Sequence, residues 1–164
     1  MRAYRGDLPS KKNGDSKLVD THKFMSYALK EAKKAFFENE VPVGAVAVYE
    51  NKIIAKARNK VIRIKNPLAH AEMELIRKIV KKLNNFRCPG VTVFTTVEPC
   101  PMCISALIHL RVDRLIYGTE SPKWGFFTKH KMDLTLFNHK IDIQSGVLNE
   151  ECAKILKDFF KKLR

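Results

Sequence analysis

Two short motifs, thirty positions apart, have to meet in space if this chain binds a metal, and that requirement restricts how it can fold. Cys100 and Cys103 have the i, i+3 spacing that places two side chains on one face of a helix. Pro101 between them is favoured in a first helical turn, where its missing N–H costs nothing. The helix dipole and free N–H groups at that end favour thiolate over thiol. His70 completes a His–Cys–Cys set, which supplies three zinc ligands and leaves a fourth position for water, as in catalytic sites.

Each motif alone has an ordinary explanation. A single histidine at a helix start is more often structural, and a lone C-x-x-C can be a redox pair or half of a structural zinc site. A structural zinc needs a fourth protein ligand, and the spare candidates His109, Cys88 and Cys152 are not at a recurrent ligand spacing. We therefore interpret Cys88 and Cys152 as free thiols. The two motifs together predict one catalytic Zn²⁺ per subunit, with Glu72 left uncoordinated to move protons.

Charge and length narrow the class of protein. The 164 residues suit one domain, no apolar run is long enough to span a bilayer, and no secretory signal is visible, so we expect a cytoplasmic protein. The net charge is +14, and residues 51–65 and 75–87 contain only basic charges. Such clusters favour a polyanionic partner, nucleic acid before membrane. The alternative is a lysine-rich composition with solvated side chains.

Hydrophobic periodicity predicts an alternation of helices and strands. Helices are expected over residues 20–39, 101–110 and 149–163, and from His70 onward. Strands are expected over 43–49, 53–57, 91–95 and 115–117, with Gly118 ending the last of these and a possible fifth strand at 141–144. The final helix should bury one apolar stripe that includes Cys152, Phe159, Phe160 and Leu163. This order predicts an α/β protein with helices packed on a central mixed sheet.

The sequence also resembles a known family. His70-Ala71-Glu72 followed by P-C-P-M-C is similar to the signature of zinc-dependent nucleobase deaminases. From about Phe24 to the C-terminus the chain resembles the bacterial tRNA-specific adenosine deaminases (TadA-type), so residues 19–164 would form the deaminase domain after a flexible basic arm, residues 1–18. The segments that carry the likeness are Val41–Val46, Arg58-Asn59, Asn66–Glu72, Val97–Cys100 and Cys152–Phe160.

The resemblance implies a fold and a reaction. The fold would be the three-layer α/β/α cytidine deaminase-like one, with five strands in its central mixed sheet. The family acts as a homodimer and deaminates adenosine to inosine at the wobble position of an arginine tRNA, with zinc-bound hydroxide attacking the adenine carbon. His70, Cys100 and Cys103 would be the zinc ligands, and Glu72 would shuttle protons.

The resemblance also implies contacts to the substrate. The residues concerned are Asn59, Ala71 (through its backbone N–H), Val43, Pro99 and Phe159. Phe159 and Phe160 match aromatic residues on the RNA-binding side of the family, but both can equally be core residues of the last helix.

Departures from the family pattern leave alternatives open. Ser121 stands where the family commonly has Asp, which puts a contact to the RNA in doubt. In the following loop, Trp124, Phe126 and Phe127 could stack on unpaired bases or pack on the core or a dimer contact. Pro101 also occurs in bacterial guanine deaminases, so the alternative function is a free nucleobase or nucleoside deaminase. A third possibility is a zinc-containing RNA-binding subunit without catalysis, against which Glu72 argues.

Overall fold

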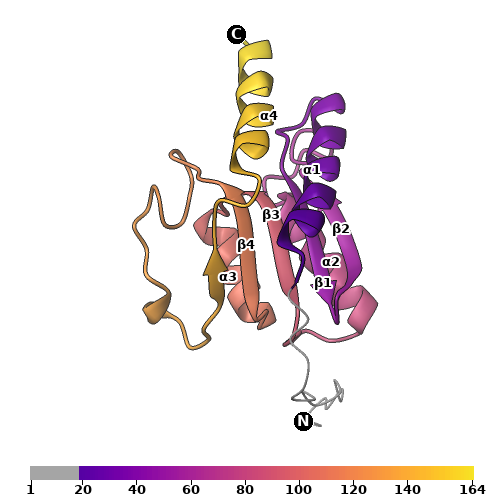
Figure 1. Cartoon of the computed structure of the whole chain (residues 1–164), viewed down its shortest axis with the longest axis vertical. Helices are drawn as coiled ribbons and strands as arrows, with labels where there is room; N and C mark the ends of the chain where they lie inside the picture. The colour runs from indigo at the N-terminus through magenta and orange to yellow at the C-terminus, as the bar shows by residue number, and fades with distance from the viewer. Residues whose placement is uncertain (1–18) are drawn as a thin grey trace.

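The protein, described here for residues 19–164 by a computed structural model, places a sheet between two helical layers (Figure 1). The predicted arm, residues 1–18, lies outside the described residues. The elements in chain order are α1 (Thr21–Phe37), β1 (Gly44–Tyr49), β2 (Lys52–Arg58), α2 (Ala71–Leu83), β3 (Thr92–Val97), α3 (Pro101–Leu110), β4 (Arg114–Thr119), η1 (Leu134–Leu136), β5 (Asp142–Gln144) and α4 (Asn149–Lys162). None of the described helices is long and apolar enough to cross a membrane.

The sheet is mixed and has the strand order β2-β1-β3-β4-β5. β1 is antiparallel to both of its neighbours, whereas β3, β4 and β5 are parallel. Alternate side chains face opposite layers, as strand geometry requires. Val46 and Phe94 pack with α1 and α4, and Val93 and Leu115 pack with α2 and α3. The predicted three-layer α/β/α fold with five strands is confirmed.

Strand direction explains why the two motifs meet. Because β1 is antiparallel to both β2 and β3, the two strands that flank β1 run in the same direction and end at the same edge of the sheet. Gly44 pairs with Arg58 at the end of β2, and Ala45 pairs with Thr95 near the end of β3. The segments that follow these strands lead into α2 and α3, so both helices begin at this edge (Figure 1).

Local signals in the sequence set two of the boundaries. Glu50 and Asn51 join β1 to β2 with φ of 48° and 60°, the left-handed pair of a two-residue hairpin turn. The side chain of Asp20 accepts a hydrogen bond from Lys23 N at 2.9 Å and caps α1. Turn geometry therefore sets the connection between β1 and β2, and a side-chain hydrogen bond sets the start of α1.

The prediction that Gly118 ends its strand is wrong, because β4 continues through it to Thr119. A Cβ at this position would lie 2.4 Å from Cys152 Sγ and 2.7 Å from Thr96 O. The glycine lets α4 pack directly on the strand, so close approach and not a turn explains its presence.

The apolar stripe predicted for α4 is only partly buried. Cys152 and Phe159 are buried, but Phe160 is 49% exposed and Leu163 is 66% exposed. The last turns of α4 project beyond the sheet (Figure 1), so the end of the stripe is less covered than its beginning. All four cysteines are free, as expected for Cys88 and Cys152.

Candidate active site

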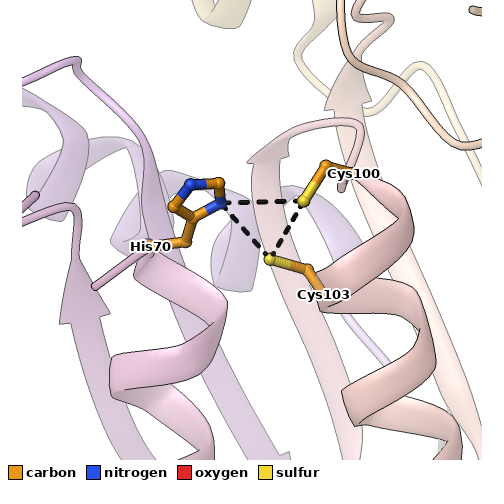
Figure 2. A group of neighbouring side chains, drawn as sticks. All are labelled: His70, Cys100 and Cys103. Atoms are coloured by element: carbon orange, nitrogen blue, oxygen red, sulfur yellow. Dashed lines mark hydrogen bonds between the residues drawn. The ribbon is translucent and has the colours of Figure 1, made fainter. Parts of the chain in front are cut away.

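Both metal-binding motifs lie at helix N-termini. His70 is the N-cap residue of α2, and Cys100 is the N-cap residue of α3 with Pro101 in the first helical position. Both N-cap residues have extended backbones, and neither side chain caps its own helix. Each side chain is therefore available to point across the gap between the helices, where the His70 ring faces both sulfur atoms (Figure 2).

The three candidate ligand atoms form a nearly equilateral triangle. His70 Nδ1 lies 3.7 Å from Cys100 Sγ and 3.5 Å from Cys103 Sγ, and the two sulfur atoms are 3.6 Å apart (Figure 2). Tetrahedral zinc with ordinary Zn–S and Zn–N bonds would separate its ligands by about 3.8 Å for S–S and about 3.5 Å for S–N. The donor set and its spacing fit a zinc ion with one position left open.

The protonation of these groups also suits a cation. A hydrogen bond from the Cys103 thiol, together with one from His70, lowers the pKa of Cys100 to about 4. The same bond to Cys100, with burial, raises the pKa of Cys103. The pKa values of the two thiols are thus shifted in opposite directions, and a divalent cation bound between the sulfur atoms would favour the deprotonated form of both.

Glu72 lies in the first turn of α2, directly beside this group. Its side chain is buried, and Oε2 lies 3.6 Å from Cys103 Sγ. Burial raises the pKa of the Glu72 carboxyl above its ordinary value, so this group binds a proton more readily than an exposed glutamate. A buried carboxylate with a raised pKa next to a metal group has the properties of a general acid and base.

Thr95, a residue of β3 that the sequence did not single out, contacts Glu72. Its Oγ1 lies 3.3 Å from Glu72 Oε1 and 3.2 Å from Val97 O. A hydroxyl has one hydrogen, so it can donate to Glu72 when the carboxyl is ionised. When Glu72 is protonated, the carboxyl can donate to Thr95 and the hydroxyl to Val97 O. Thr95 can therefore form a hydrogen bond with the Glu72 carboxyl in either protonation state of that carboxyl.

Four of the residues predicted to contact substrate, namely Val43, Asn59, Ala71 and Pro99, lie around the same edge of the sheet. Asn59 follows β2 directly, is 5% exposed, and donates from its backbone N to Val43 O at 3.0 Å. Ala71 is the first residue of α2, where a backbone N–H has no acceptor within the helix. Pro99 directly precedes Cys100, and its carbonyl accepts a hydrogen bond from Phe126 N.

Comparison with known proteins identifies the family. The MafB19-like deaminase model matches residues 19–164. A tRNA-specific adenosine deaminase from Bacillus subtilis (strain 168) is 42% identical over 143 residues, which cover 86% of this chain and 89% of that protein. The chain belongs to the tRNA-specific adenosine deaminase family. Another member, from Aquifex aeolicus (strain VF5), is 41% identical over 86% of this deaminase and 94% of its own length.

Solved structures agree with this assignment. One from biochemical and structural studies of A-to-I editing by tRNA:A34 deaminases is 36% identical, with a TM-score of 0.76, and covers 82% of this deaminase and 99% of that chain. A guanine deaminase from Nitrosomonas europaea also reaches a TM-score of 0.76, over 97% of each chain, but at 21% identity. The second likeness shows the shared fold alone.

The aromatic residues of this deaminase divide into buried and exposed ones. Phe126 is fully buried against Phe127, with ring centroids 4.9 Å apart, so it is a core residue and is not free to stack on a base. Trp124, two positions earlier, is 69% exposed. Phe159 is 3% exposed and packs edge-on against Phe36 of α1 at 6.0 Å. The structure does not bring Phe159 into contact with the metal-binding group.

Three buried polar residues around the site were missed from the sequence: Glu40, Thr95 and Glu98. Glu40 is fully buried and bonds the Asn59 side chain, and Glu98 is 3% exposed and bonds the loop after β4. Glu98 lies within the V-E-P-C segment that carries the family likeness, so its position could have drawn attention. Glu40 and Thr95 gave no such signal, because their partners lie 19 and 23 positions away.

Proposed function

We propose that this chain catalyses the hydrolytic deamination of adenosine to inosine in tRNA, at the wobble position of the anticodon. The observation that carries the proposal is the His70–Cys100–Cys103 triangle beside buried Glu72, in a chain 42% identical to a tRNA-specific adenosine deaminase. Residues 19–164 are the catalytic domain of this proposal. An arginine tRNA as substrate, a homodimeric enzyme and a cytoplasmic location belong to the same proposal.

We assign one Zn²⁺ to His70, Cys100 and Cys103, because the donor types and their spacing fit this ion. When bound, zinc would lower the pKa of a bound water molecule to about 7 and so supply a nucleophile at neutral pH. The N-termini of α2 and α3 hold the three side chains toward one another, so little reorganisation accompanies metal binding.

Glu72 performs the proton transfers in this proposal. The reaction consumes one water, forms a C6–O bond, breaks the C6–N bond and releases ammonia. The Glu72 carboxylate accepts a proton from the attacking water and delivers it to N1 of the purine. It then takes the second proton from the new C6 hydroxyl and gives it to the departing amine, which leaves as ammonia while the C6 oxo group forms. Burial supports these steps because it raises the pKa of this carboxyl and keeps bulk water from competing for the proton. Thr95 keeps the carboxyl oriented in both of its states.

The surface charge supports an RNA partner once paired and unpaired cations are separated. At the end of β2, Arg58 bonds Glu38 at 2.6 Å, and in the following loop Lys60 bonds Glu74 at 3.1 Å, so these cations are neutralised internally. Arg77 of α2 also bonds Glu74, at 2.8 Å. These ion pairs remove much of the basic character that the sequence suggested for residues 58–63 and position 77.

Four of the remaining cations lie around one depression, which we name the lysine groove. It is a depression of about 590 Å³ between β2 and the second half of α2, lined by Lys56, Lys78, Lys81 and Lys82. The Lys56 ammonium lies over the ring of Tyr27 in α1. Within residues 19–164 none of the four forms an ion pair with a carboxylate. Burial, together with the positive charge of Lys60, lowers the pKa of Lys78. A bound phosphate would relieve this charge crowding, and an RNA backbone supplies phosphates in series.

The proposed function is tested by single-turnover deamination of an anticodon stem-loop with adenosine at the wobble position, beside free adenosine, guanine and cytosine. We expect inosine in the stem-loop alone. Glu72→Gln should lower the rate by at least about a hundredfold while one zinc per chain and the folded state are kept, since general acid–base catalysis contributes this much or more. Glu120→Gln, which removes an exposed carboxylate, is the matched control.

The other outcomes have definite meanings. Ammonia from a free base, with an inert stem-loop, would replace the proposal with a metabolic deaminase. Stem-loop binding without turnover by either protein would indicate a non-catalytic RNA-binding subunit. Full activity in Glu72→Gln would show that this carboxylate does not perform the proton transfers assigned to it.

A further inference from the structure

A buried carboxylate outside the metal group organises the loop that contains Asn59. Glu40 lies between α1 and β1 and is fully buried. Its Oε1 accepts a hydrogen bond from Arg63 N at 2.5 Å, and its Oε2 accepts from Ile62 N at 3.1 Å and from Asn59 Nδ2 at 3.0 Å. All three partners are N–H donors, so the carboxylate acts only as an acceptor.

This arrangement fixes which way the Asn59 amide points. Because Glu40 accepts, the NH₂ group of Asn59 must face it, and Oδ1 must face away. Within residues 19–164 Oδ1 has no hydrogen-bond partner, and no buried side-chain oxygen or nitrogen is left unpaired, so Oδ1 reaches solvent. The next residue, Lys60, donates its backbone N to Ala69 O, one position before His70. Asn59 is therefore tied to the segment that holds the first metal ligand.

We propose that Glu40 is a positioning residue that sets the polarity of the Asn59 amide and thereby the purine edge that Asn59 recognises. The inference rests on the proposed function and on Asn59 contacting the base. One N–H of Asn59 is engaged by Glu40, so the second N–H and Oδ1 remain as a donor beside an acceptor. Adenine offers the matching pair, N7 as acceptor and the 6-amino group as donor. Guanine offers two acceptors at the same edge, N7 and O6, and one of them would face Oδ1.

The competing explanation is that Glu40 only anchors the loop. A pair of substrates that differ at N7 can distinguish this explanation from the proposal. Stem-loops with adenosine or 7-deazaadenosine at the wobble position differ only in the N7 acceptor. In the wild type, loss of N7 should lower kcat/KM by about tenfold, the worth of one hydrogen bond. In Glu40→Gln, the new NH₂ group can turn toward Asn59 and let that amide reverse. The N7 effect should then shrink to within about twofold, while adenosine itself is processed about tenfold more slowly.

A purely structural role would slow both stem-loops equally and leave their ratio unchanged. Because the ratio is compared between enzymes, any intrinsic effect of removing N7 on reactivity cancels. Glu50→Gln, at the exposed turn between β1 and β2, removes the same charge and should keep the wild-type ratio. Zinc content should be equal in all three proteins.

If Glu40→Gln does not fold, the reversed pair Glu40→Gln/Asn59→Asp restores a hydrogen bond between the two side chains with opposite polarity. The side chain at position 59 then has no N–H to offer, so this variant should also lose the N7 effect. A wild-type ratio in either variant, or a wild type indifferent to N7, overturns the inference. A wild type inert toward the adenosine stem-loop would instead refute the proposed function.

Discussion

Replacing Glu98 with glutamine should destabilise this deaminase and loosen the loop beside the metal group. Glu98 is 3% exposed, and its carboxylate accepts hydrogen bonds from the backbone N–H groups of Ser121 at 2.9 Å, Phe127 at 2.7 Å and Thr128 at 2.8 Å. These bonds close the loop after β4 onto the segment between β3 and α3. The carboxylate is thus the acceptor around which the loop is folded.

The size of the effect follows from counting acceptors. Glutamine has one oxygen where Glu98 has two, so its NH₂ group must face at least one of the three N–H donors. A buried donor left unpaired costs about 1–3 kcal/mol, and the remaining bonds lose the assistance of the charge. We expect the free energy of unfolding to fall by about 2–4 kcal/mol, with the melting temperature falling by about 2–4 °C for each kcal/mol.

The pH dependence gives a second, independent check. Burial opposes ionisation of Glu98, but hydrogen bonds from Ser121, Thr128 and Phe127 outweigh it, and the pKa of this carboxyl is lowered. A lowered pKa in the folded state contributes stability above the pKa of the unfolded chain and loses it as the pH falls through the folded value. The difference between wild type and Glu98→Gln should therefore be full at neutral pH and shrink in acid.

Urea unfolding of the metal-free proteins between pH 7 and pH 3 measures this difference without a contribution from zinc release. Glu120→Gln, in the same segment but exposed, is the control and should unfold like the wild type. Equal stability of the Glu98 and Glu120 variants at pH 7 would refute the reasoning, as would a difference that does not change with pH.

Two further predictions concern the surface and the core. Changing Lys78, Lys81 and Lys82 of the lysine groove to glutamine should weaken binding of the stem-loop or the tRNA. The slope of log Kobs against log salt concentration should become shallower by about 0.7 for each phosphate that is no longer neutralised. A control variant with the same number of charges removed, at exposed Lys33, Lys140 and Lys157, should leave that slope nearly unchanged. Equal slopes in the two triple variants would contradict phosphate binding in the lysine groove. Gly118→Ala should destabilise the fold by about 1–3 kcal/mol, because the added methyl group meets Cys152 Sγ at 2.4 Å. Combining it with Cys152→Ala should cost less than the sum of the single changes in urea unfolding, and strict additivity would exclude this steric clash as the cause.

Much of the metal group could be predicted because its signals are local. The i, i+3 spacing of the cysteines and the proline between them specify a helix start whatever surrounds them, and the structure places Cys100 at that N-cap. The turn at Glu50 and Asn51 is equally local. That the two motifs would meet was inferred from resemblance, and the antiparallel placement of β1 between β2 and β3 supplies the physical reason.

The sequence misled where a residue's role depended on a distant neighbour. Gly118 resembled a strand terminator because glycine usually interrupts strands, but its lack of a side chain makes room for Cys152 of α4. Phe160 fitted the periodicity of a buried stripe, yet α4 extends past the sheet at that point and leaves it 49% exposed. Periodicity identifies which face of a helix is apolar, and only the packing of the other elements decides how much of that face is covered.

By itself the sequence determined the ligand types, the helix starts that present them and the excess of positive charge. The tertiary structure decided which cations remain unpaired and which buried acids support the site. Glu40, Thr95 and Glu98 act through partners between 19 and 30 positions away. Strand order and direction set such pairings, and these arise from burial of the whole sheet between two helical layers, so no short stretch of sequence contains them.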